Sequence, residues 1–286
     1  MNQVDLHCHT TASDGVLEPR ELVRRAAHLA LTVMAVTDHD TTAGLPEALA
    51  GGRARGIEII PGVEINTDVP GGEVHVLGYF IDWQDPAFTD QLGRLREGRL
   101  ARARQMVDKL AALGAPIRLE RVLQLARDGS VGRPHVAQAL VEAGHVATFG
   151  EAFDRYIGRD RPAYVERLKF SPADACRLIR QAGGVPVWAH PIPFDATPMG
   201  LQGPLPFEGM LPELVDAGLQ GLEVYYPGYG ARAIEYLTRL AHQHELILTG
   251  GTDFHGFPPI QVDIGGIYVP MKAVRRLRAT WEKLRA

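Results

Sequence analysis

Short apolar runs alternate along the chain with segments whose apolar residues recur at helical spacing. The apolar runs begin at residue 4 and include residues 31–37, 57–63, 74–81, 185–189 and 246–252, with a further strand-like run ending at Tyr225. The helical segments are residues 19–30, 41–55, 171–181, 208–217, 231–244 and 271–285. This alternation predicts parallel strands joined by helical crossovers, with about seven or eight strands. We therefore expect an α/β fold, and a (β/α) barrel rather than an open sheet.

One part of the chain breaks the alternation and contains helical segments only, at residues 86–113, 119–127, 134–143 and 149–156. We interpret residues 86–164 as an all-helical insertion that caps the substrate, and residues 1–85 and 165–286 as the barrel. The stretch 94–169 carries 15 Lys and Arg against 9 Asp and Glu, whereas the rest carries 15 against 25. The barrel should therefore attract cations, and the insertion anions.

The basic residues of this stretch divide into two kinds. Arg94, Arg96, Arg99, Arg102 and Arg104 lie on one helical segment and are predicted mostly to form a solvated face. Other basic residues lie at turns and loops, and a helix N-terminus beside an arginine suits a phosphate. The predicted substrate contacts are Arg133 and His135 after Gly132, Arg159 in a loop, and Lys169 just beyond it.

Histidines and carboxylates gather where the apolar runs end. His7 and His9 are two residues apart on a predicted strand, so their side chains point to the same face. In a barrel, functional groups lie at the carboxyl ends of the strands, so side chains at the ends of different runs can meet. The candidate metal ligands are His7, His9, Asp14, His39, Asp40, Glu64, His75, His190, Asp253 and His255.

Histidines and carboxylates occur at the ends of so many apolar runs that metal ligands explain them better than scattered surface residues do. A lone His-x-His motif is weak support, but six of the eleven histidines belong to this set. Imidazole and carboxylate ligands without thiolate suit Mn²⁺, Fe²⁺, Zn²⁺ or Co²⁺, and the ligand types alone do not choose among these ions. The sequence contains no phosphate-binding or dinucleotide-binding glycine fingerprint, so ATP- or NAD-driven chemistry is not expected.

Length, charge and cysteine content narrow the class of protein. The 286 residues contain no apolar run of about 18 residues and start on a predicted strand, so we expect neither a membrane span nor a signal peptide. Two cysteines give no disulfide framework, which favours the cytoplasm. A net charge of −4 lacks the basic signature of proteins that bind long duplexes, so duplex DNA is not expected as a partner.

In its motifs the chain resembles the PHP domain family (polymerase and histidinol phosphatase) of metal-dependent hydrolases. The matching residues are His7-Cys8-His9, Ser13-Asp14-Gly15, Thr37-Asp38-His39-Asp40, Pro61-Gly62-Val63-Glu64, His75, Ala189-His190-Pro191 and Gly251-Thr252-Asp253-Phe254-His255. The resemblance implies a distorted (β/α)₇ barrel with up to three divalent metals, Mn²⁺ being our first choice. The insertion, with residues 131–137, is further similar to a branch containing 3′,5′-nucleoside bisphosphate phosphatases and 5′-to-3′ exoribonucleases.

The resemblance also implies how the ligands divide among the metals. One metal would take His7, His9, Glu64 and Asp253, the second Glu64, His75 and His190, and the third Asp14, His39 and His255, with Asp40 beside the cluster. Two metals sharing a carboxylate would lie about 3.5–4 Å apart, and water bridging them would be the nucleophile. The third metal could offset the charge that grows on the phosphate. Asp40 and His190 are candidates for protonating the leaving oxygen.

The implied activity is hydrolysis of a phosphate ester. Our preferred substrate is a 3′,5′-nucleoside bisphosphate such as pAp, which would lose its 3′ phosphate. A short RNA cleaved from its 5′ end, another phosphodiester and histidinol phosphate are alternatives. A PHP protein that only binds is disfavoured, because every motif position is intact.

Two further segments have open interpretations. The Pro- and Gly-rich stretch 192–208 is either a lid over the site or a surface loop. The tyrosines of residues 225–229 either stack on a nucleobase or pack in the core or at its rim.

Overall fold

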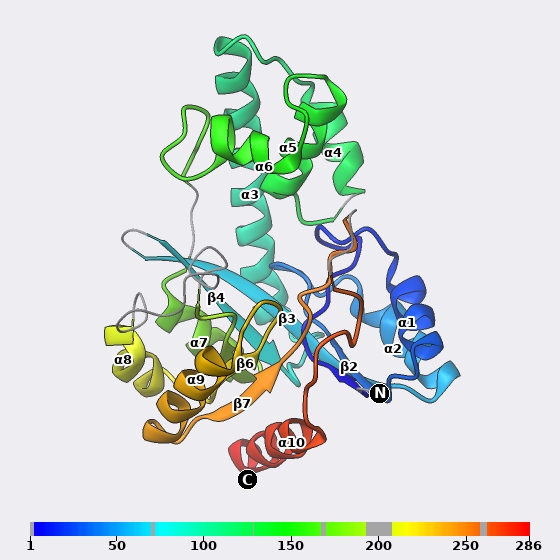
Figure 1. Cartoon of the computed structure of the whole chain (residues 1–286), viewed down its shortest axis with the longest axis vertical. Coiled ribbons are helices and arrows are strands. Elements are labelled where there is room, and N and C mark those ends of the chain that lie inside the picture. The colour runs from blue at the N-terminus through cyan, green and yellow to red at the C-terminus, as the bar shows by residue number, and fades with distance from the viewer. Residues whose placement is uncertain (1–2, 70–71, 128, 167–169, 193–207, 258–261) are drawn as a thin grey trace.

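The computed structural model describes residues 3–286 apart from 70–71, 128, 167–169, 193–207 and 258–261. A seven-stranded sheet curls on itself, and helices surround it (Figure 1). The strands lie in chain order as β1 (Val4–Asp5), β2 (Val33–Val36), β3 (Glu58–Val69), β4 (Gly72–Tyr79), β5 (Val185–Trp188), β6 (Gly221–Tyr225) and β7 (Ile247–Gly250). Leu6 N donates to Gly250 O at 3.2 Å, so the first and last strands meet. The predicted distorted (β/α)₇ barrel is confirmed.

The prediction of parallel strands is wrong for β4. This strand runs antiparallel to both β3 and β5, while the other neighbouring pairs are parallel. Only two residues separate β3 from β4, and a parallel crossover needs about a dozen or more. The resulting hairpin pairs Asn66 with His75 and carries Glu64 on the same strand as Asn66, so it brings these three polar residues together.

Helices cover the outer face of the sheet. They are α1 (Pro19–His28), α2 (Leu45–Arg55), α7 (Pro172–Gln181), the 3-10 turn η3 (Glu208–Met210), α8 (Leu211–Asp216) and α9 (Ala231–Gln243). Their buried faces form the largest hydrophobic cluster, in which Leu22 of α1 and Ile179 of α7 are fully buried. Within the described ranges, no helix combines the length and apolar character needed for a bilayer crossing.

The C-terminal helix α10 (Met271–Arg285) closes one end of the barrel (Figure 1). Ala273, Val274 and Leu277 of this helix belong to the same buried cluster as Leu6 and Tyr79 of the barrel interior. Helix α10 thus acts as a hydrophobic plug, which leaves the opposite end for polar side chains.

Truncating this plug should destabilise the fold. Leu277 is fully buried, so Leu277→Ala should cost about 2–5 kcal/mol of unfolding free energy through lost burial and a residual cavity. The matched control is Lys283→Ala, on the exposed side of the same helix. Thermal denaturation should show a clear fall in Tm for the first variant only, and equal Tm values would refute the assignment of α10 as a plug.

The insertion covers the other end of the barrel (Figure 1). It contains α3 (Pro86–Ala112), α4 (Leu119–Ala126), α5 (Arg133–Glu142), α6 (Phe149–Ala152) and the π-helical turn η1 (Phe153–Ile157). These elements have their own hydrophobic cluster, which includes Met106 and Leu140. The first turns of α3 pack instead in the core of the barrel, through Phe88, Leu92 and Leu95. That residues 86–164 form one unit stays a prediction, and α3 contributes to both cores.

The prediction of a solvated arginine face on α3 is wrong for two of its residues. Arg99 and Arg102 are only 7% and 9% exposed, whereas Arg94 and Arg104 are exposed as expected. These two arginines are buried by tertiary packing, because α3 passes over the polar end of the barrel. Burial of the Arg99 guanidinium is offset there by its ion pair with Asp40.

Candidate metal centre

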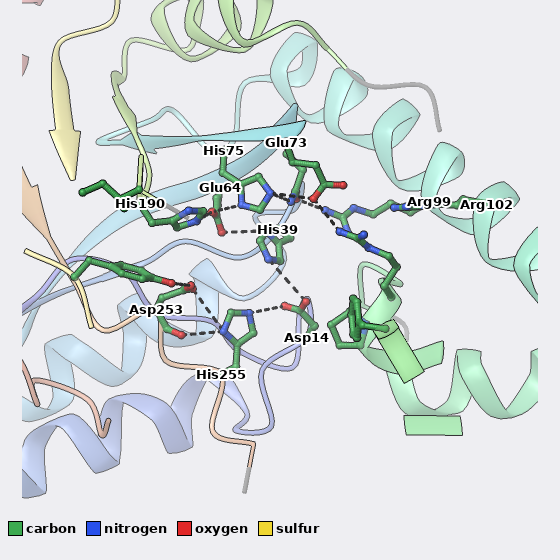
Figure 2. A pocket seen from close by; sticks show the side chains of 16 residues that line it. Asp14, His39, Glu64, Glu73, His75, Arg99, Arg102, His190, Asp253 and His255 are labelled. Atoms are coloured by element: carbon green, nitrogen blue, oxygen red, sulfur yellow. Dashed lines mark hydrogen bonds and ion pairs between the residues drawn. The ribbon is translucent and has the colours of Figure 1, made fainter. Parts of the chain in front are cut away.

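The predicted ligands meet at the end of the barrel that faces the insertion (Figure 2). The backbone after β1 pairs with the backbone after β7, since His9 N donates to Phe254 O at 3.0 Å and Phe254 N to His7 O at 3.4 Å. Asp253 and His255 flank Phe254, so this pairing sets four ligands side by side. Cys8 points away from them into the outer core, as the alternation of a strand predicts.

Two buried carboxylates hold the segments that carry ligands. Asp38 accepts hydrogen bonds from Thr10 N and Thr10 Oγ1, both at 2.7 Å, and so orders the turn before Asp14. Asp5 accepts from Thr252 N at 2.9 Å and from Thr252 Oγ1 at 2.6 Å, directly before Asp253. Burial raises the pKa of both carboxyls, and the hydrogen bonds they accept oppose this rise.

Three site residues have a left-handed backbone. The φ angles of Asp40, His190 and Asp253 are 53°, 28° and 51°. Such conformations cost on the order of 1–3 kcal/mol in residues with a side chain and cluster at functional sites, where the surroundings fix them. Here they turn the chain sharply, so that one residue can face the candidate ligands while its neighbour in sequence packs in the hydrophobic core.

The candidate ligand atoms form three groups, and within each group all atoms lie within 4.8 Å of one another. The groups are His7, His9, Glu64 and Asp253; Glu64, His75 and His190; and His9, Asp14, His39 and His255. They match the sets implied by the family resemblance, with His9 added to the third. Glu64 belongs to two groups, because its Oε2 lies 3.2 Å from His7 Nε2 and its Oε1 lies 2.8 Å from His75 Nδ1.

Several buried polar atoms in these groups lack a hydrogen-bond partner in the described part of the chain. They are both ring nitrogens of His9, Oδ1 of Asp14, Nδ1 of His39 and Oδ1 of Asp253. Leaving a buried polar atom unpaired costs about 1–3 kcal/mol, so their convergence needs a physical reason. Divalent cations would bind the carboxylate oxygens and one ring nitrogen of each histidine, and the residues therefore fit metal ions.

The charges of these groups depend on one another. Burial raises the pKa of Glu64, but the surrounding histidines, His39 foremost, hold it well below its usual value. Burial lowers the pKa of His75 and His255, but nearby carboxylates outweigh it, Glu64 raising that of His75 to about 9 and Asp14 that of His255 to about 10. In the absence of a cation, protons on these imidazoles balance the carboxylates. A metal must displace those protons, so its affinity should fall as the pH is lowered.

Asp40 does not join any ligand group among the described residues, in contrast to its prediction as a ligand. Its Oδ2 accepts from Arg99 Nε at 2.6 Å and its Oδ1 from Asn66 N at 3.2 Å. Arg99 also donates to Asn66 Oδ1, and Asn66 Nδ2 lies 2.7 Å from His75 Nε2. Arg99 and Asn66 therefore link Asp40 to His75 of the centre.

A cavity of about 370 Å³ lies between the ligand groups and the insertion (Figure 2). One wall is formed by the carboxylates and imidazoles of the barrel. Arg99, Arg102 and Arg133 line the cavity from the insertion, with Phe153 beside them. Arg133 Nη2 donates to Glu73 Oε2 at 2.8 Å, which links α5 to the β3–β4 hairpin. The two walls thus offer a cation site and an anion site across one small space.

The predicted substrate contacts differ in their positions. Arg133 lines the cavity, while His135 and Arg159 are absent from its lining. His135 is buried, and its Nδ1 accepts from Gly132 N at 2.9 Å, which stabilises the start of α5. Arg159 Nη2 donates to Gly72 O at 2.9 Å, which ties the insertion to the hairpin. His135 and Arg159 therefore bind other parts of the protein, and neither is among the residues that line the cavity.

The remaining predictions concern two loops. Lys169 and residues 193–207 of the suggested lid lie outside the described residues. Tyr226 lines the cavity and donates to Asp253 Oδ2 at 2.8 Å. Tyr229 is buried and its hydroxyl bonds to both backbone groups of Ile192. Core packing is thus the correct alternative for Tyr229, and Tyr226 supports a candidate ligand.

The sequence interpretation missed Glu223 and Asn66. Glu223 lies in the middle of β6, is fully buried and accepts from the ring of His7 at 3.0 Å. A signal was available, because an acidic residue inside an otherwise apolar strand is rarely buried without a partner. Asn66 gave no comparable signal, since an asparagine on a hairpin strand is common at the surface.

Comparisons with known proteins agree with this geometry. The PHP domain profile matches residues 5–129. A 5'-3' exoribonuclease of Haemophilus influenzae is 36% identical over 98% of this chain and 98% of its own length. A 3',5'-nucleoside bisphosphate phosphatase of Chromobacterium violaceum is 36% identical over 89% of this chain and 88% of its own.

Solved structures extend the agreement to the whole fold. A protein of Bifidobacterium adolescentis assigned to the metal-dependent phosphoesterases superposes with a TM-score of 0.86 at 32% identity, over 97% of this chain and 96% of that one. The likeness therefore includes the insertion as well as the barrel. Together with the three ligand groups, these similarities show that the chain belongs to the PHP domain family and is a metal-dependent phosphoesterase.

Proposed function

We propose that the enzyme removes the 3′ phosphate from a 3′,5′-nucleoside bisphosphate. The observation that carries this proposal is the cavity with two opposed walls, one of candidate metal ligands and one of arginines. A substrate with one phosphate to hydrolyse and a second to bind matches both walls. The similarity to a nucleoside bisphosphate phosphatase over most of both chains supports the same choice.

The three ligand groups would hold up to three divalent ions, and the family resemblance makes Mn²⁺ the first choice among the ions that imidazole and carboxylate ligands suit. When bound, such ions supply an activated water and offset the negative charge that grows on the reacting phosphate. The protein's own part is to fix the ligands. Glu64 contributes to two groups, and Tyr226 holds the orientation of Asp253.

The arginine wall binds and orients the substrate. Arg133 would bind the phosphate that is not hydrolysed, and it would exchange its ion pair with Glu73 for that phosphate. Arg99 is already held by Asp40 and Asn66, so we assign it to positioning. Of the two predicted acids for the leaving oxygen, Asp40 is paired with Arg99, and His190 lines the cavity but would bind the second metal, so the identity of the acid stays a prediction.

A 5′-to-3′ exoribonuclease acting on short RNA is the second candidate. It is favoured by the similarity to such an enzyme along almost the full length of both chains. The cavity volume suits one nucleotide, so a longer RNA would place its remaining residues outside it. Both activities use the same metal centre and differ in what lies beyond the scissile phosphate.

We place the enzyme in the cytoplasm and its substrate among small nucleotides or short RNA. Cys8 and Cys176 are both unpaired and buried, which suits a reducing compartment. The net charge of −4 disfavours long duplexes.

A phosphate-release screen tests the substrate proposal. Purified enzyme with Mn²⁺ should hydrolyse pAp with a higher kcat/KM than histidinol phosphate or AMP, because only pAp engages both walls. A 5′-phosphorylated RNA of a few nucleotides, followed by release of mononucleotides, measures the second candidate in parallel. Comparable kcat/KM values for histidinol phosphate and pAp would show that the arginine wall does not select the substrate.

A further inference from the structure

Glu223 is a buried carboxylate whose contacts reach two of the ligand groups. It lies on β6 between Leu222 and Val224, which are themselves fully buried, and its own exposure is 0%. A carboxylate at such a position is tolerated only when its oxygens receive hydrogen bonds. Its Oε1 lies 3.0 Å from His7 Nδ1, and its Oε2 accepts from the backbone N of His190 at 2.8 Å.

The contact with His7 fixes which ring nitrogen faces the metal centre. A carboxylate accepts hydrogen bonds, so Nδ1 of His7 carries the proton in this pair. Nε2 is then the ring nitrogen that can bind a metal, and Glu64 Oε2 and Asp253 Oδ1 lie 3.2 and 3.3 Å from it. A carboxylate behind an imidazole is the usual arrangement for a metal-ligating histidine.

The contact with His190 fixes a backbone rather than a ring. His190 has a φ of 28°, a conformation that the surroundings must hold in place. The hydrogen bond from its N–H to Glu223 is one such restraint. Its ring then reaches the second group, with Nε2 at 3.1 Å from Glu64 Oε1. The rings of His7 and His190 lie nearly parallel, with their centroids 5.8 Å apart.

We propose that Glu223 is a positioning residue that couples two metal sites, those of the groups containing His7 and His190. The proposal rests on the proposed metal sites and is independent of which phosphate ester is the substrate. Losing the carboxylate should weaken both sites together, although Glu223 belongs to neither ligand group.

The conservative change Glu223→Gln separates the carboxylate from the shape of the side chain. A glutamine has one acceptor oxygen and an NH₂ group, so it cannot accept from both His7 and His190 in the same geometry. If its NH₂ faces His7, it donates to Nδ1 and favours the proton on Nε2, which removes the ligand lone pair. If its NH₂ faces His190, it meets the backbone N–H of His190, which is also a donor, so the hydrogen bond that restrains the His190 backbone is lost.

The test measures binding of Mn²⁺ alone to metal-free protein, by competition with a chelating dye, and counts bound ions by native mass spectrometry. Glu223→Gln should bind at least two ions about 10–100-fold more weakly than the wild type, as is typical when the carboxylate behind a ligating histidine is lost. Glu223→Asp, whose carboxylate is one methylene shorter, should show a smaller loss. Glu235→Gln, on the exposed side of α9, is the control and should bind like the wild type.

Activity provides a second readout that separates positioning from direct catalysis. Excess Mn²⁺ should restore most of kcat in Glu223→Gln, because the defect is in metal occupancy. Thermal denaturation of the metal-free variants checks that they fold, and the Asp variant serves if the Gln variant does not. Unchanged Mn²⁺ affinity in a folded variant overturns the proposal. Weaker binding of a single ion, with the others unchanged, overturns the coupling of the two sites.

Discussion

Replacing Glu64 by glutamine is expected to remove metal binding and phosphate release together. The Glu64 carboxylate lies against five imidazoles of the site, at 2.8–3.2 Å, and serves two ligand groups. Glutamine removes the negative charge that two cations would share. A bound metal is worth several kcal/mol of transition-state stabilisation, and each 1.36 kcal/mol is tenfold in rate, so kcat/KM should fall by about 10³-fold or more.

Elemental analysis and phosphate release, measured on the same preparations, check this result. The matched control is Glu213→Gln, which changes an exposed glutamate of α8 that is outside every ligand group and should leave the metal content unchanged. Chelation should abolish wild-type activity, and added Mn²⁺ should restore it. Activity that survives exhaustive chelation, or full turnover by the Glu64 variant, would contradict the role of metals in this site.

Arg133→Ala is expected to discriminate between substrates with two phosphates and substrates with one. A charge-assisted contact to a phosphate is worth about 1.5–3 kcal/mol, so kcat/KM for pAp should fall by tens to hundreds of fold. A simple phosphate monoester has no second phosphate to lose and should be affected far less. Metal content should stay the same, because Arg133 touches Glu73 and Phe153 and no candidate ligand in the contacts described.

The control for this change is Arg121→Ala on α4, an exposed arginine of the insertion that pairs with Glu142 away from the cavity. It removes the same charge from the same part of the protein and should leave both substrates unaffected. Remote contacts can also orient the reacting group, so some loss of kcat on pAp accompanies the loss of binding. Equal losses for both classes of substrate would instead assign Arg133 to the integrity of the site.

The candidate ligands could be predicted from sequence because their signal is local. All of them except Asp14 lie in an apolar run or within a few residues of its end, and strand geometry alone places His7 and His9 on one face. Barrel topology then brings the ends of separate strands to one place. The same reasoning predicted about seven or eight strands, and the sheet has seven, because each strand is a short apolar run.

The residues that were mispredicted depend on contacts far apart in sequence. Arg99 is one of several arginines at helical spacing, and only its position over Asp40 distinguishes it from Arg94. Asp40 follows His39 in a ligand-rich motif, but its carboxylate turns to the insertion. The direction of β4 was misjudged because period-two patterning is the same in either orientation, and only the short connection to β3 decides it.

The division of α3 between two cores has a consequence for how new specificity could arise. At 1.5 Å per residue, its 27 residues form a rod about 40 Å long, anchored in the barrel by Leu92 and Leu95 and in the insertion by Met106 and Leu110. Arg99 and Arg102 lie between these anchors, so the rigid helix fixes their distance from the candidate ligand groups. A homologue that accepts a longer or shorter substrate should therefore differ in side chains along this rod, while the rod itself keeps its place.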